Sequence, residues 1–199
     1  MQNILTNTLP TRIETEYGIF EPVTDFRAGV EFEIMVENGG TDIFNLLSVY
    51  YPNNTFTEDD ESTVKAAEVA LWFYMCGDKA KKENKPAKKS KQGYSFSVDS
   101  EVIYSDFSRF YNIDLTSENL HWWKFRALLA GLPNDSSFKE RIYYRTCDLK
   151  GLPQKEKKRI SEIRKEIAIK DKKEIKVTLE QRNQQMLEYV AKRSKEMRG

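Results

Sequence analysis

The chain has 199 residues, 39% of them hydrophobic and 32% charged, and a formal net charge of +1, so it can bury one ordinary core beneath a strongly solvated surface. Its longest apolar stretch, residues 69–76, is far shorter than the ~20 residues that span a bilayer, and its first residues lack the basic start and apolar run of a signal peptide. Its two cysteines, Cys76 and Cys147, have no spacing typical of a disulfide framework or a zinc site, and we expect a protein of the reducing cytoplasm of a cell.

A β-hairpin is the first element that the sequence predicts. Residues 11–15 alternate between β-branched and charged side chains, Tyr17-Gly18 supplies a turn, and residues 19–20 begin the returning strand. Prolines bracket the pair, which is typical of a short edge ribbon rather than of a central sheet.

Residues 25–37 fit two patterns. Apolar residues recur every four positions from Phe26 to Ile34, as on a helix, but apolar residues also alternate with glutamates across residues 30–36, as on a strand. We predict a helix because Asp25 can cap its start and the Asn-Gly-Gly that follows can end it.

Two further helices complete an N-terminal part of the domain over residues 1–77. The first covers residues 43–50. The second has Thr57 as its expected cap, three acidic residues that favour a helix N-terminus, and a stop at Gly77. Residues 78–92 then contain almost no apolar group, and this composition predicts a flexible basic linker.

Four helices are expected to complete the same domain over residues 93–170. The first would place its apolar residues, from Val98 to Tyr111, on one side. The second would have Thr116 as its cap and run over residues 120–129.

The third and fourth of these helices have clear start signals. Ser137 and Glu140 have the spacing of a capping box, and Pro153 would lie in the first turn of the fourth helix. Residues 171–199 should form a basic C-terminal helix with a narrow apolar stripe made of Leu179, Met186, Val190 and Met197. The fold class predicted is mainly α, with a helical bundle core, a small N-terminal β-hairpin, a flexible Lys-rich linker and a C-terminal amphipathic helix.

Residues 120–132, LHWWKFRALLAGL, would be apolar around much of a helix. Such a helix must be covered on several sides, which favours a central core position for Trp122 and Trp123. Part of this surface could instead bind a partner. We therefore take Phe125 and Tyr143, with the stripe of the C-terminal helix, as candidate partner-binding residues.

Catalytic signatures are nearly absent. The sequence has no phosphate-binding glycine loop, and its single histidine excludes multi-histidine metal sites. His121 could pair with a cysteine as a nucleophilic dyad, and Asp171, Glu174 and Lys176 faintly resemble a metal-dependent nuclease core. Neither pattern is specific, and we expect no catalytic site, cofactor or metal.

The distribution of charge leaves a second hypothesis open. Residues 1–78 have three basic and fourteen acidic groups (net −11), whereas residues 150–199 have sixteen basic and eight acidic groups (net +8). The linker and the C-terminal helix could bind phosphates, but the linker lacks the interleaved aromatic or arginine residues that stack on bases. Nucleic-acid binding through these two segments is the alternative to protein binding.

Several segments, in the same order, carry a resemblance to the bacteriophage "gene product fifteen" family. The most specific is LHWWKF at residues 120–125. The supporting segments are NILTNTLPTRIE at 3–14, TDFR at 24–27, YSFSVDSEVIYSDF at 94–107, YNIDL at 111–115 and RTCDLKGLPQKEKKRI at 145–160.

This resemblance implies a protein from tailed phages or prophages of Gram-positive bacteria. Genes of the family typically lie between those for the major tail protein and the tape measure protein. That position implies a tail-assembly chaperone in the cytoplasm of the bacterial host, which would bind the tape measure protein or tail-tube subunits. Self-association and a membrane-free, non-enzymatic role are further expectations.

Overall fold

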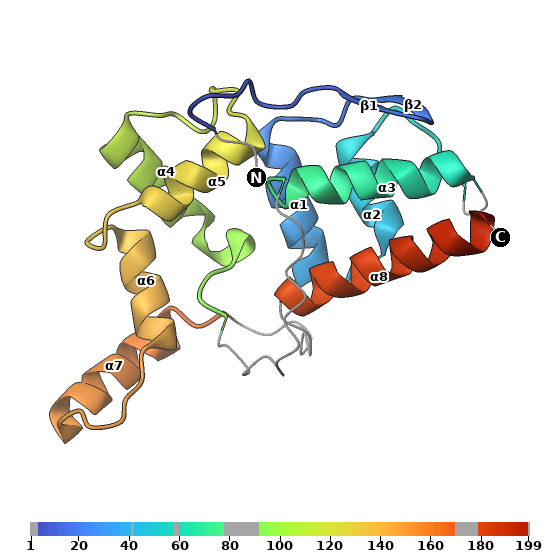
Figure 1. Cartoon of the computed structure of the whole chain (residues 1–199). Coiled ribbons are helices and arrows are strands. Elements are labelled where there is room, and N and C mark those ends of the chain that lie inside the picture. Colours follow the sequence, from blue (N-terminus) through green and yellow to red (C-terminus); the bar gives the residue numbers. More distant parts are fainter. Residues whose placement is uncertain (1–3, 41, 58–59, 78–91, 170–178, 199) are drawn as a thin grey trace. The chain divides into compact units, whose positions relative to one another are not determined.

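The computed structural model describes residues 4–40, 42–57, 60–77, 92–169 and 179–198 (Figure 1). The structure is mainly helical and has a small antiparallel sheet near the N-terminus, which confirms the predicted fold class. Its internal contacts define two compact units. Unit 1 is drawn from residues 1–85, 120–125 and 175–199, and unit 2 from residues 86–119 and 126–174.

The predicted linker, residues 78–92, lies almost wholly outside the described residues, so its flexibility stays a prediction. The same holds for the expectation that residues 93–170 complete one domain with residues 1–77.

The hairpin is present where the sequence predicts it. Strand β1 (Ile13–Thr15) pairs antiparallel with β2 (Gly18–Phe20), with Ile13 opposite Phe20. Gly18 has a φ of +115°, a backbone conformation that a side chain would strain, so the glycine is needed at this turn.

Helix α1 (Phe26–Glu37) resolves the ambiguous segment in favour of a helix. The side chain of Asp25 accepts a hydrogen bond from the backbone N–H of Arg27 at 2.9 Å, and Asn38 ends the helix. Phe32 is completely buried on the inner face of this helix.

Helices α2 (Ile43–Tyr50) and α3 (Glu61–Tyr74) follow α1 and pack in sequence order. The prediction that Thr57 caps α3 was wrong. Asp60 caps the helix, because its carboxylate accepts from the Ser62 backbone N–H at 2.8 Å and from the Ser62 hydroxyl at 2.8 Å.

Residues 120–125 return to unit 1 and enter its core. Helix α5 (Trp122–Gly131) starts two residues later than predicted and without Thr116 as its cap. The reason is a long-range backbone pairing. The N–H of Phe26 donates to the carbonyl oxygen of Leu120 at 2.8 Å, and the N–H of Trp122 donates to that of Thr24 at 2.8 Å. These bonds hold residues 120 and 121 outside the helix.

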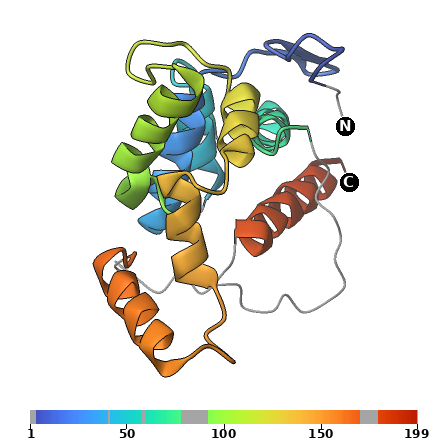
Figure 2. The ribbon, with the colours of Figure 1, turned by 90° about the vertical axis from the view of Figure 1, so that its left-hand side faces the viewer.

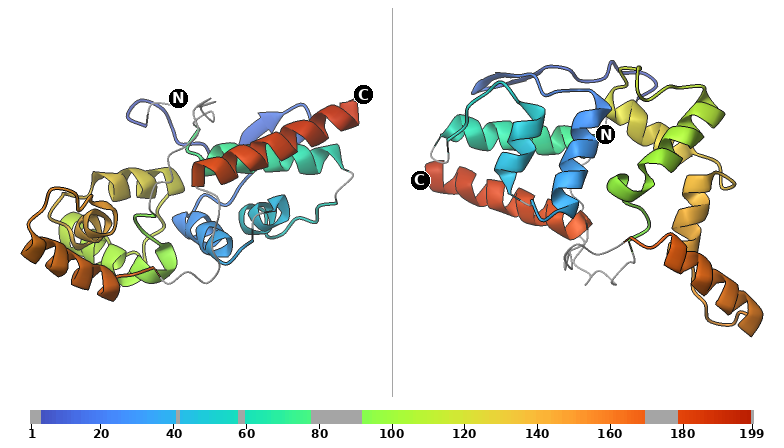
Figure 3. Two further views of the ribbon diagram at one scale, coloured as in Figure 1. Left: turned by 90° about the horizontal axis from the view of Figure 1, so that it is seen from below. Right: turned by 180° about the vertical axis from the view of Figure 1, so that it is seen from behind.

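Helix α8 (Leu179–Arg198) completes unit 1. It lies along α3 and runs in the opposite direction (Figures 1 and 3). Its range lies within the predicted residues 171–199, of which residues 171–178 lie outside the described part of the chain.

Unit 2 contains α4 (Phe96–Tyr111), the part of α5 from Arg126 onward, α6 (Ser137–Thr146) and α7 (Gln154–Glu166). Helices α6 and α7 lie side by side and are joined by a short loop (Figure 2). The hydroxyl of Tyr111 donates to the carbonyl oxygen of Leu128 at 2.8 Å, which ties the end of α4 to α5 within this unit.

Three details of unit 2 correct the sequence predictions. Phe107 of the predicted side is completely buried, but Val98 is 42% exposed, and the buried face of α4 also contains Phe96 and Ile103 together with two aspartates. Ser136, one residue before the predicted capping box, accepts the capping bond from the Lys139 backbone. Pro153 precedes α7 and does not lie within its first turn.

Candidate functional site

In unit 1, helix α8 packs against helix α3, and this helix-binding face is the first candidate site. Met186 and Val190 lie four residues apart on α8 and are only 4% and 2% exposed, so they form its buried face. Tyr189, on another face of the same helix, is 45% exposed. Two of the predicted stripe residues therefore contact this chain itself. The side chains of the other two, Leu179 and Met197, lie outside the side chains that the structure describes.

Helix α3 is suited to close packing by its neighbours. Ala66, Ala67 and Ala70 are all completely buried, and small side chains let adjacent helices approach closely. The part of α8 whose side chains are described buries just two residues fully, Met186 and Val190, and burial of such residues contributes ~1.5–3 kcal/mol each.

Phe125 lies in that aromatic core rather than on a surface. It is 1% exposed, and its ring stacks on Phe26 with 4.6 Å between the ring centroids. Trp122 is completely buried, and its indole ring stacks on the ring of Tyr74. In the described arrangement Phe125 stabilises unit 1 and offers no exposed contact to a partner.

Tyr143 is the opposite case, because it is 58% exposed on α6 of unit 2. Its ring contacts Tyr144 edge-on, with centroids 5.5 Å apart. Arg164 of α7 donates to the backbone oxygens of Tyr144 and Cys147 at 2.6 and 2.5 Å, which fixes α7 against the end of α6. Tyr143 and the basic helix α7 therefore belong to one helical hairpin, and Tyr143 is open to a partner.

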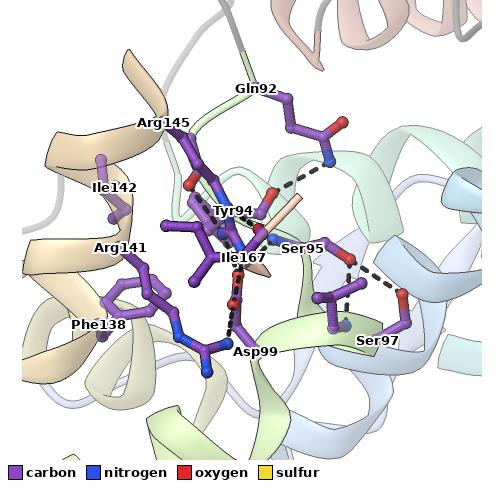
Figure 4. A network of polar contacts seen from close by, with 12 residues as sticks. Gln92, Tyr94, Ser95, Ser97, Asp99, Phe138, Arg141, Ile142, Arg145 and Ile167 are labelled. Atoms are coloured by element: carbon purple, nitrogen blue, oxygen red, sulfur yellow. Dashed lines mark hydrogen bonds and ion pairs between the residues drawn. The ribbon is translucent and has the colours of Figure 1, made fainter. Parts of the chain in front are cut away.

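A buried ion network organises unit 2 and was missed by sequence reasoning (Figure 4). Asp99 of α4 is completely buried and accepts from the guanidinium groups of Arg145 at 2.5 Å and Arg141 at 2.9 Å, both on α6. Arg145 also donates to the carbonyl oxygens of Gly93 and Ile167. Four separate segments are thereby held together around one carboxylate.

The charge of Asp99 is maintained by these partners. Burial by itself would raise the pKa of this carboxyl, but the hydrogen bonds from Arg145 and Arg141 outweigh burial and hold the pKa below its usual value. A second buried aspartate, Asp106, accepts from the backbone N–H groups of Ser137 and Phe138 at the start of α6. Both aspartates act as structural groups that join α4 to α6.

His121 does not have the geometry of a catalytic base. Its Nδ1 accepts from the backbone N–H of Trp123 at 3.1 Å, and its Nε2 lies 3.1 Å from the carbonyl oxygen of Pro10. Because Nδ1 accepts, Nε2 carries the proton and donates to Pro10. Burial lowers the pKa of His121, which favours this neutral form. Both ring nitrogens are thus engaged by backbone groups, as in a structural histidine.

The other candidate chemistry concerns metal ions. Among the residues that the structure describes, no three His, Cys, Asp or Glu side chains are grouped so as to hold a metal ion. The nuclease-like pattern of Asp171, Glu174 and Lys176 lies outside the described residues. None of the helices in the described ranges is long and apolar enough to cross a membrane.

Comparison with known proteins gives one match. A family model described as "Bacteriophage Gp15 protein" matches residues 5–169, which include the aromatic core and α1 to α7 and end before α8. No curated protein and no solved structure matches the chain.

Proposed function

The chain belongs to the bacteriophage Gp15 protein family, and from this premise we propose that it is a non-enzymatic tail-assembly chaperone. Its client is the tape measure protein, a long helical protein, or the tail-tube subunits that polymerise around it. The work takes place in the cytoplasm of the bacterial host, where tails assemble. The gene position that the family resemblance implies supports this role.

The observation that carries the proposal is the packing of α8 on α3. This face of unit 1 packs against an amphipathic helix, and Met186 and Val190 are the buried residues on the part of α8 whose side chains the structure describes. A helix-in-groove contact is one of the recurring ways in which proteins bind helical clients.

Co-expression tests the proposal. The tape measure protein encoded by the same phage is produced alone, with this chain, and with an unrelated helical protein of similar size. We expect soluble tape measure protein to increase only with this chain, and the two proteins to co-purify through a tag on this chain. A tape measure protein that stays insoluble, or that is soluble without co-purifying, would contradict the proposal.

Nucleic-acid binding remains the second candidate function, and one observation in unit 2 favours it. The exposed Tyr143 lies on the same helical hairpin as the basic helix α7. Binding to non-specific DNA is measured by fluorescence anisotropy as salt is raised from about 50 to about 200 mM, a range over which phosphate contacts weaken steeply. A strong, salt-dependent affinity that Tyr143→Ala reduces would favour this function over the chaperone role.

A further inference from the structure

We propose that the face of α3 covered by α8 is a seat for an amphipathic helix of another chain, and that α8 occupies it as an intramolecular competitor. The named client rests on the proposed function. The inference that α8 covers a helix-binding face of α3 and can be displaced from it rests on the geometry of unit 1. On this view a client helix does not bind to α8. It replaces α8.

The first support is the nature of the contact. Met186 and Val190 make the buried face of α8, whereas the neighbouring Gln185 and Tyr189 are exposed. Helices of this kind are stabilised mostly by docking rather than by their own propensity. Methionine, with its flexible and polarizable side chain, is typical of contact surfaces that adapt to more than one partner. A contact of this kind can be exchanged for an equivalent one made by another amphipathic helix.

The second support is the position of the two helices relative to the family match. Helix α3 lies inside the matched residues, 5–169, whereas α8 lies beyond them. The family match therefore includes the helix that carries this face and ends before the helix that covers it. This is the pattern expected if the seat has an occupant other than α8.

The third support is charge. Residues 1–78, which supply α1 to α3, have a net charge of −11, with three basic and fourteen acidic groups. Residues 170–199, which include α8, have nine basic and five acidic groups, a net charge of +4. Opposite charge favours this pairing and steers encounters between partners. The partner helix that fits the seat thus has two apolar side chains four residues apart and a basic net charge.

The covalent connection makes α8 an effective competitor. A tethered segment has an effective concentration on the order of millimolar for a short linker, without any gain in intrinsic affinity. A client helix binds the seat when its own effective concentration or its contact area exceeds that of α8. A long helical client with repeated basic, amphipathic segments would meet both conditions.

A pair of matched variants of the full chain tests this inference. The release variant, Met186→Asp with Val190→Asp, places two carboxylates at the buried positions. The control variant, Gln185→Asp with Tyr189→Asp, adds equal charge at the adjacent exposed positions of the same helix. The probe is a fluorescently labelled peptide with the sequence of residues 178–199, and its binding is followed by anisotropy.

We expect the release variant to bind the peptide with a Kd at least about tenfold lower than the wild-type and control chains, because its own α8 no longer competes. A peptide with the same two aspartates should not bind. Equal binding by all three chains would overturn the inference. Loss of the tryptophan near-UV circular dichroism in the release variant would also overturn it, because α8 would then be an integral part of the core.

The assay contains no tape measure protein, so its failure overturns the seat while leaving the chaperone role open. Failure of the co-expression experiment with the tape measure protein would bear on the client and not on the helix-binding face of α3. It removes the proposed client without changing the peptide result.

Discussion

The indole N–H of Trp123 donates a hydrogen bond to the carbonyl oxygen of Phe73 at 2.7 Å, across fifty residues of sequence. The adjacent Trp122 makes the equivalent bond to the carbonyl oxygen of Tyr74 at 2.8 Å. Two successive indoles thus bind the last turn of α3, where a helix has carbonyl oxygens without helical partners. The most specific segment of the family resemblance is therefore a structural element of unit 1.

Trp123→Ala should lower the free energy of unfolding by ~3–5 kcal/mol, the usual cost of truncating a buried aromatic side chain. Against a typical total of ~5–15 kcal/mol this loss is severe. Urea denaturation followed by circular dichroism measures it, with Tyr143→Ala on the exposed surface as the control. A Trp123→Ala protein as stable as its parent would show that this residue is not part of the core.

Gly29→Ala should destabilise unit 1 by ~1–3 kcal/mol, the usual cost of overpacking a core. A Cβ atom at this position of α1 would lie 2.4 Å from the ring of Trp122, so the ring or the helix must shift. Glu31→Ala, at an exposed position of the same helix, is the matched control and should change stability little. Equal melting temperatures for the Gly29→Ala protein and the wild type would contradict the close contact.

Asp99→Asn should cost ~3–5 kcal/mol, because it leaves the guanidinium group of Arg145 buried without its counter-charge. Glu101→Gln, at an exposed position of α4, tests whether loss of any carboxylate from this helix is enough. Equal stability of the two variants would mean that the buried network does not stabilise unit 2.

The same network predicts a dependence on pH. The pKa of Asp99 is lower in the folded chain than its ordinary value of 3.8, so the folded state binds fewer protons than the unfolded state. The stability it contributes is present above pH 3.8 and is lost as the pH falls through the lower, folded-state pKa. Acid titration of the wild type should show this loss, and the Asp99→Asn protein should show a smaller one. Identical acid profiles would contradict the assignment.

The sequence predicts local elements well here because their signals are local. Asp25 caps α1 with its own side chain, and the turn at Gly18 needs a positive φ. Long-range pairings were missed for the same reason. The start of α5 is delayed by backbone bonds to residues 24 and 26, and no pattern near Leu120 shows those partners.

In the candidate site, too, local features could be predicted from the sequence and long-range contacts could not. The narrow apolar stripe led us to predict a helix that binds a partner, whereas Met186 and Val190 are buried within this chain, and the stripe cannot show that α3 is the helix against which α8 packs. The prediction of the buried face of α4 failed because a charged residue is ordinarily expected on the solvent-exposed face of a helix. Asp99 is inside because arginines on another helix, more than forty residues away, neutralise it.

Raising ionic strength should loosen α8 because its docking joins a basic segment to an acidic one. Screening shortens the Debye length from ~10 Å at 0.1 M to ~3 Å at 1 M salt. Backbone amides of α8 should then exchange hydrogen faster, whereas those of α2, which packs in the core, should not. Exchange in α8 that is independent of salt would show that charge has no part in holding it.

Amide hydrogen exchange of the full chain, free and in complex with the tape measure protein, tests the central claim most directly. If a client helix takes the seat on α3, the amides of α8 should lose protection on binding while those of α3 keep theirs. Protection of α8 that stays the same or increases in the complex would contradict displacement, and an increase would mean that α8 itself contacts the client.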